Sequence, residues 1–207
     1  FQSQFYPKLE TFNQQWQSIT RSDGVDSIFR YVSPLLNPMR PRIRLMAMSH
    51  PLMQPLLGHY LCEHVRLKKA LLIRPDCSGF SKVRNQPAEM AILGKTHLYE
   101  VMGDTLQKKV LNSGFAAEHI VGDGANETLK NLTAQDNIAI FQGLTDGDDQ
   151  ESVYFWRVCL NAGAGLYIAG KAASISDGMV YAHDLLKQGK VKDIVAQCRK
   201  ALAGTHH

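Results

Sequence analysis

The chain lacks several features that mark whole classes of protein. It has no apolar run near the roughly 18 residues that a membrane-spanning helix requires, no internal repeat and no low-complexity tract. Its four cysteines lie far apart, with no Cys-x-x-Cys pair and no histidine at metal-ligand spacing: Cys62, Cys77, Cys159 and Cys198. We therefore expect buried free thiols, a cytoplasmic location and no membrane partner.

Charge of either sign is modest overall but unevenly distributed. The net charge is +4, yet residues 1–110 carry 15 Lys and Arg against 8 Asp and Glu, while residues 111–207 carry 8 against 11. A basic half suits ligands that bear phosphate, including nucleic acid, and it equally suits an ordinary solvated surface.

The two ends of the sequence are unusual. It opens on Phe1 without an initiator methionine, and residues 204–207 resemble a cloning scar with part of a histidine tag. We expect that a longer N-terminal part precedes this chain, and we exclude the last four residues from the fold. With 44% hydrophobic residues, the remainder suffices for one domain over residues 1–203.

The first half of the chain predicts a strand, a helix and a second strand. Residues 43–48 form an apolar run, Ser49 with Pro51 marks a helix start, and Ala70 to Ile73 form another buried strand. This order implies a right-handed crossover between two parallel strands. Its mouth, at residues 74–83, is where open α/β sheets bind ligands.

The helix after Ser49 is expected to bury one face, made of five apolar residues: Leu52, Leu56, Leu57, Tyr60 and Leu61. Residues 84–117 have little pattern, and we expect short strands and turns there. From residue 125 onward the sequence is typical of helices.

A long helix is expected over residues 151–173. Its glycines 163, 165 and 170 suggest close packing against another backbone, and Asn161 is expected to satisfy backbone groups between helices. Ser174 or Ser176 then starts a further helix to Lys187, and a last helix runs to about Leu202.

Three stretches carry a more specific pattern. They are FYPKL (5–9) with GVDSIFRYVSPLLNPMRP (24–41), SHPLMQPLLGHYLCEHVRLKKALLI (49–73) and LNAGAGLYIAGKAASISDGMVYAHDLL (160–186). Together they resemble the C-terminal α/β part of the anthranilate phosphoribosyltransferase family. The resemblance implies an open, mainly parallel sheet flanked by helices, of the nucleoside phosphorylase/phosphoribosyltransferase type, with the N-terminal helical domain absent. A lead-in and hinge (1–42), a sheet region (43–124) and a helical part (125–203) would make up this domain.

The resemblance also implies an activity. Family members displace pyrophosphate from phosphoribosyl pyrophosphate (PRPP) with the nitrogen of an aromatic amine, in tryptophan biosynthesis, with Mg²⁺ on the phosphates and as homodimers. The hinge would line the amine channel, which makes Pro34 and Asn37 candidate substrate-binding residues. Catalysis would consist mainly of positioning and charge neutralisation.

The chain departs from the family pattern where this chemistry is expected. The arginine that grips the anthranilate carboxylate is Thr20 here, and Arg21 at the next position is either its substitute or an ordinary surface residue. The Asp-Glu pair that binds Mg²⁺ aligns with Gly79 and Phe80. Asp76 is the one carboxylate left in that loop, either a turn cap or a poor metal ligand, so we predict no metal site.

These departures keep a second hypothesis open, a non-catalytic paralogue that binds nucleic acid through a basic face. The candidate phosphate or nucleic-acid contacts are Arg40, Arg42, Arg44, Lys68, Lys69 and Arg74, with Arg66, Lys82 and Arg84 beside them. Against this hypothesis, the basic residues are not interleaved with aromatic ones. The intact SPLLNP hinge and NAGAGLYIAGKAA segment favour the transferase.

Overall fold

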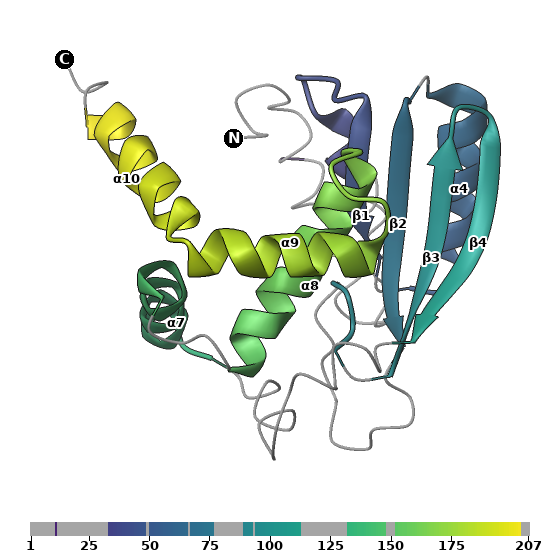
Figure 1. Cartoon of the computed structure of the whole chain (residues 1–207). Helices are drawn as coiled ribbons and strands as arrows, with labels where there is room; N and C mark the ends of the chain where they lie inside the picture. Colours follow the sequence, from purple (N-terminus) through teal and green to yellow (C-terminus); the bar gives the residue numbers. More distant parts are fainter. Residues whose placement is uncertain are drawn as a thin grey trace.

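The computed structural model of the chain describes Thr11 and residues 33–48, 50–65, 67–76, 89–92, 94–112, 132–147 and 152–203. Within these ranges a short 3₁₀ turn, η1 (Ser33–Leu36), precedes four strands and five helices (Figure 1). The strands are β1 (Ile43–Ala47), β2 (Lys69–Asp76), β3 (Lys95–Met102) and β4 (Thr105–Asn112). The helices are α4 (Met53–His64), α7 (Ala134–Asp146), α8 (Val153–Ile168), α9 (Ile175–Lys187) and α10 (Lys190–Ala203).

The four strands form one open sheet in the order β1-β2-β3-β4. β1 pairs with β2 in parallel, whereas the β2–β3 and β3–β4 pairs are antiparallel. The predicted open sheet flanked by helices is confirmed, but the described sheet is mixed rather than mainly parallel. The reason is that β3 and β4 are joined by a tight turn, which permits only antiparallel pairing.

The predicted β1–α4–β2 crossover is confirmed, and its strands begin and end close to the expected positions. The predicted apolar face of this helix is confirmed at Leu57 and Leu61 and wrong at its other three residues. The residues of α4 that face the sheet are Gln54, Leu57, Gly58 and Leu61, whereas Leu52, Leu56 and Tyr60 are exposed. The buried set follows i, i+3, i+4, i+7 spacing, which places one narrow stripe against the strands.

The hairpin of β3 and β4 replaces the short strands and turns expected in residues 84–117. Each strand has eight residues, and their two-residue connection is Gly103-Asp104. Gly103 has φ 59°, the left-handed value that such hairpin turns require at their first central position and that glycine adopts without strain.

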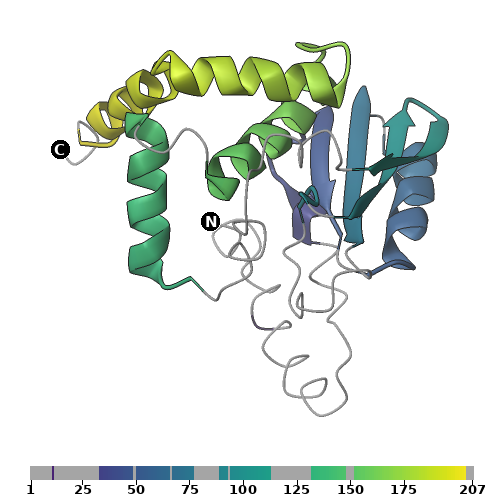
Figure 2. The ribbon, with the colours of Figure 1, turned by 60° about the horizontal axis from the view of Figure 1, so that its bottom comes forward.

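Helices cover both faces of the sheet, with α4 on one side and α8 and α9 on the other (Figure 2). Leu71 and Ile73 of β2 point into the core beneath α8, and Ala70 and Leu72 point into the core beneath α4. This alternation follows from the period of two along a strand. It also determines on which of the two faces of the sheet each polar residue of β2 and β3 lies.

Helices α8 and α9 cross with their backbones in contact at Gly163 and Gly178. A Cβ built on Gly178 would lie 2.4 Å from the Gly163 carbonyl oxygen, which no side chain tolerates. The predicted close approach is therefore confirmed at Gly163. It is wrong for Gly165 and Gly170, since a Cβ at either position would meet nothing within 4 Å.

Local sequence sets the helix ends. Ser174 caps α9 by accepting a hydrogen bond from the Asp177 N–H, as predicted. The preceding helix ends at Ile168 rather than at residue 173, because Gly170 adopts φ 72° and the N–H groups of Gly170 and Lys171 bond back to Tyr167 and Leu166. This is the Schellman arrangement that glycine favours after a helix.

No helix in the described ranges is long and apolar enough to cross a bilayer. The described cysteines are free thiols, with Cys159 buried, Cys62 half-buried and Cys198 exposed, so the expectation of buried thiols fails at Cys198. Burial raises the pKa of Cys159 to about 12, which keeps that thiol protonated and inert. Cys77 lies outside the described residues.

Candidate functional site

Three polar residues gather at the carboxyl end of β2, the predicted mouth of the crossover. Asp76 is the last residue of β2, and its Oδ2 lies 3.0 Å from Nε2 of His97 on β3. Arg74 lies opposite His97 in the ladder. Strand alternation places all three on the α4 face, and the side chains of His97 and Asp76 remain 21% and 30% exposed. Ligands of open α/β sheets bind at this kind of position.

Helix α4 fixes the backbone beneath this group. The Gln54 side chain is buried, and its Nε2 donates to the carbonyl oxygens of Leu72 (2.9 Å) and His97 (2.8 Å). Both hydrogens of the amide are thus used on two neighbouring strands. A buried amide whose two N–H groups are both used in this way holds the strands and the helix start in one geometry.

The mouth does not fit a magnesium site in the described residues. Its one carboxylate, Asp76, bonds to His97, and no group of three or more His, Cys, Asp or Glu within the described ranges is arranged to hold a metal ion. Asp76 is the last residue of β2, and the turn that it is predicted to cap lies outside the described residues. Gly79 and Phe80 lie outside the described residues.

The hinge candidates lie at the opposite end of the sheet. Pro34 lies in η1, and Asn37 is exposed and closes a turn: its Oδ1 accepts from the Met39 N–H (2.9 Å) and its carbonyl accepts from the Arg40 N–H (3.0 Å). The side-chain oxygen of Asn37 is therefore engaged locally. Arg21, the third predicted substrate-binding residue, lies outside the described residues.

The six basic candidates do not form one face. Arg40, Arg42 and Lys68 are exposed at the amino ends of β1 and β2, where the Arg42 carbonyl accepts from the Lys68 N–H (2.8 Å). Arg74 lies five residues along β2 from Lys69, roughly 17 Å away at the rise of a strand. The predicted contacts therefore fall into two separate groups.

Arg44 is buried rather than exposed, with 9% of its surface accessible. Its Nε donates to the Pro41 carbonyl (3.2 Å), while its Nη1 has no hydrogen-bond partner among the described residues. Burial lowers the pKa of this guanidinium. A side chain so enclosed is poorly placed to meet a nucleic-acid backbone.

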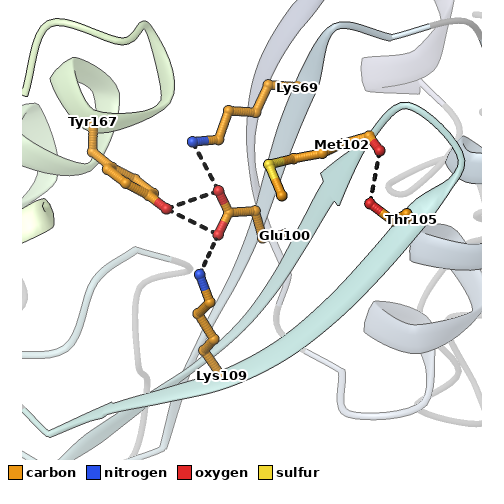
Figure 3. A network of polar contacts seen from close by, with 6 residues as sticks. All are labelled: Lys69, Glu100, Met102, Thr105, Lys109 and Tyr167. Carbon is orange, nitrogen blue, oxygen red and sulfur yellow. Dashed lines mark hydrogen bonds and ion pairs between the residues drawn. The ribbon is translucent and has the colours of Figure 1, made fainter. Parts of the chain in front are cut away.

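Lys69 belongs to a network around Glu100 that Figure 3 shows in full. Glu100 on β3 is 1% exposed and accepts from Lys109 of β4 (2.6 Å) and from the Tyr167 hydroxyl (2.8 and 2.9 Å), while Lys69 lies 2.8 Å away. The Lys69 ammonium also lies 3.9 Å from the centre of the Tyr167 ring. One carboxylate thus joins three strands to the end of α8.

The pKa of Glu100 reflects the hydrogen bonds that its carboxylate accepts. Burial by itself would raise its pKa, but the hydrogen bonds from Lys109, Lys69 and Tyr167 outweigh burial and lower the pKa to about 2. The same contact raises the pKa of Lys109. Glu100 stays ionised at every ordinary pH, so it serves structure and not proton transfer.

Asn161 satisfies backbone groups, as predicted, although not between helices. Its Oδ1 accepts from the Met90 N–H (2.9 Å) and its Nδ2 donates to the Arg157 carbonyl (2.9 Å). Arg157 also pairs with Glu89. Asn161 and Arg157 therefore hold residues 89–92, the approach to β3, against α8.

Sequence reasoning missed His97, Gln54 and Glu100. His97 and Glu100 belong to the poorly patterned middle of the sequence, and Gln54 is a polar residue within an apolar helix. The available signal was Gly103-Asp104 between two stretches of strand-forming residues, which indicates a hairpin. With that hairpin assigned, His97 and Glu100 fall on opposite faces of a strand beside β2.

Comparison with known proteins agrees with this architecture. The model of the glycosyl transferase family, a/b domain, matches residues 2–192. The anthranilate phosphoribosyltransferase of Caldicellulosiruptor saccharolyticus is 26% identical over 195 residues, covering 92% of this chain and 53% of that protein. The Burkholderia multivorans enzyme of the same name is 28% identical over 192 residues, covering 91% and 51%.

Solved structures give the same result for the fold. The anthranilate phosphoribosyltransferase of Saccharomyces cerevisiae, in complex with PRPP and Mg, superposes with a TM-score of 0.66 at 10% identity, covering 85% of this chain and 47% of that one. The chain thus spans about half the length of the relatives that it matches. With the family model matched over residues 2–192, the chain belongs to the glycosyl transferase family as its a/b domain.

Proposed function

We propose that the protein carrying this chain transfers the phosphoribosyl group of PRPP to the nitrogen of an aromatic amine. The observation that carries the proposal is the match to the family's a/b domain over residues 2–192, joined to relatives named anthranilate phosphoribosyltransferase along about nine tenths of the chain. The crossover mouth with Arg74, Asp76 and His97 supplies polar groups where such a ligand would bind.

The test is a calorimetric titration of the full-length protein with PRPP in the presence of Mg²⁺, followed by an assay of amine consumption with anthranilate. Saturable heat together with PRPP-dependent loss of anthranilate fluorescence supports the proposal. No heat at millimolar PRPP contradicts it. Heat without consumption of anthranilate points to another acceptor for the same phosphoribosyl donor.

Magnesium, a homodimer and a cytoplasmic location stay predictions. A structural neighbour binds Mg together with PRPP. The described residues of this chain offer no matching set of ligands, so we assign the ion no step of the reaction. Sedimentation of the full-length protein tests the dimer.

Nucleic-acid binding is the second candidate, and it now depends on fewer residues. Of the six predicted contacts, Arg40, Arg42 and Lys68 lie exposed along one edge, whereas Lys69 is paired with Glu100. A protein that neutralises phosphates loses affinity steeply as salt rises. DNA affinity measured between about 50 and 200 mM salt therefore tests this candidate, and a flat log-log plot contradicts it.

A further inference from the structure

The carboxyl end of β2 holds a partly exposed pair of a histidine and a carboxylate, His97 and Asp76. We propose that His97, oriented by Asp76, is the general base that accepts the proton of the attacking amine nitrogen. The inference deepens the proposed function and rests on it. It assigns a catalytic role to a residue outside the three stretches that define the family resemblance.

The contact with Asp76 fixes which nitrogen of His97 carries the proton. An ionised carboxylate only accepts hydrogen bonds, so the 3.0 Å contact with Oδ2 requires the hydrogen on Nε2. The lone pair of neutral His97 is then on Nδ1, which makes no hydrogen bond within the described residues. A histidine held by a carboxylate on one nitrogen and free on the other is the arrangement that general bases use.

The position of His97 is both accessible and rigid. Its side chain is 21% exposed, enough for a ligand to reach and too little for free rotation in solvent. Its carbonyl oxygen is held by the buried Gln54 at 2.8 Å, and the ladder holds its backbone opposite Arg74. Catalytic groups on strands supported by buried hydrogen bonds keep the precise geometry that proton transfer needs.

Arg74 adds a fixed positive charge beside the base. Its Nε is buried and has no hydrogen-bond partner among the described residues, although Asp76 lies two positions along the same strand. The positive charge of this half-buried guanidinium suits an anionic group of the ligand. The donor substrate carries phosphates, so the charge that Arg74 offers has a counterpart in the reaction proposed above.

The proton transfer balances with the substrates already named. The C1–O bond of PRPP breaks and its electron pair leaves with pyrophosphate, while the nitrogen lone pair forms the new C1–N bond. The attacking nitrogen then carries one hydrogen too many. That proton passes to Nδ1 of His97, which returns it to water before the next turnover.

The test replaces His97 with glutamine in the full-length protein. Glutamine keeps an N–H donor for Asp76 but has no basic nitrogen, so folding and substrate binding should persist while proton transfer fails. We expect His97→Gln to lower kcat by about 100-fold or more, the scale of general-base catalysis, with KM for the amine changed by less than about 3-fold. The matched control is His64→Gln, the same change at an exposed histidine at the end of α4.

The pH profile separates a base from a residue that only positions substrate. The fall of kcat/KM with decreasing pH, the acid limb of the profile, should disappear in His97→Gln and persist in the control. The other charged groups of the strands on this face are Arg44 of β1, Arg74 and Asp76 of β2, Lys95 of β3 and Lys108 of β4, while the first turn of α4 contributes the uncharged Gln54. Lys108→Gln should therefore leave the acid limb in place.

The outcomes distinguish the two proposals. If the wild-type protein transfers no phosphoribosyl group, the proposed function fails, and the role of His97 fails with it. If the wild-type protein is active and His97→Gln matches it in kcat at every pH, only the role of His97 is overturned. Should His97→Gln not fold, Asp76→Asn keeps the histidine but no longer requires its hydrogen to be on Nε2. An unchanged kcat in that variant overturns the proposal equally.

Discussion

The two ends of the sheet place an acidic side chain in opposite environments, one buried and one partly exposed. At the amino end of β2, Glu100 is 1% exposed and both of its carboxylate oxygens contact donors, from Lys69, Lys109 and Tyr167. At the carboxyl end, Asp76 contacts His97, and 30% of the Asp76 side chain remains exposed. A closed, satisfied network stabilises the fold, whereas a half-open pair with a spare nitrogen is available to a ligand.

Removing Glu100 should have the largest effect on stability. Glu100→Ala leaves two lysines and a tyrosine hydroxyl without their acceptor, and breaking a buried ion pair from one side costs about 3–5 kcal/mol. Urea unfolding followed by circular dichroism measures this loss. Gln107→Ala, at the exposed register partner of Glu100, is the control and should change stability by less than about 0.5 kcal/mol. Equal losses in the two variants contradict the comparison.

The second-largest loss of stability is expected at low pH, where protonation of Glu100 weakens its network with Lys69, Lys109 and Tyr167. Glu100 has a pKa of about 2 in the folded protein and about 4.3 when unfolded, so its contribution is complete above the unfolded value and disappears as the pH falls through the folded value. The full contribution is about 3 kcal/mol, of which about 2 kcal/mol is lost by pH 3. Unfolding free energies at pH 6 and pH 3 measure it.

The matched variant for this titration is Glu100→Gln, which cannot ionise. Its stability should fall less between pH 6 and pH 3 than that of the wild-type protein, by about 2 kcal/mol, since all other carboxylates are common to both. Parallel pH dependences in the two proteins contradict a depressed pKa at Glu100.

The sequence predicts one end of the sheet better than the other for a physical reason. The crossover and its mouth follow from contiguous signals: an apolar run, a helix start with proline, and a second apolar run between residues 43 and 73. The Glu100 network joins residues 69, 100, 109 and 167, and no local pattern connects positions so far apart in sequence. Only the register of three strands and the end of α8 brings them together.

The mouth itself was located but its chemistry was not. The sequence identifies Asp76 as the one carboxylate there, while its hydrogen-bond partner His97 lies 21 residues away in a segment without clear periodicity. The basic residues show the same limit. Sequence proximity grouped Arg42, Arg44 and Lys69, and the structure separates them into an exposed residue, a buried residue and a network member.

The smallest stability effect is expected at the mouth, and it sharpens the comparison most. Asp76→Asn removes a charge that is only partly buried, so we expect a loss of less than about 1 kcal/mol in urea unfolding, against several kcal/mol for Glu100→Ala. The reason is that solvent can rehydrate His97 when its partner changes, whereas Lys69 and Lys109 converge on a buried acceptor. Removing one partner of a buried ion pair costs about 3 kcal/mol or more. A loss of that size in Asp76→Asn would show that Asp76 stabilises the fold as Glu100 does. A small loss together with a large fall in kcat would assign the two ends of one sheet to different tasks, the closed end to stability and the open end to chemistry.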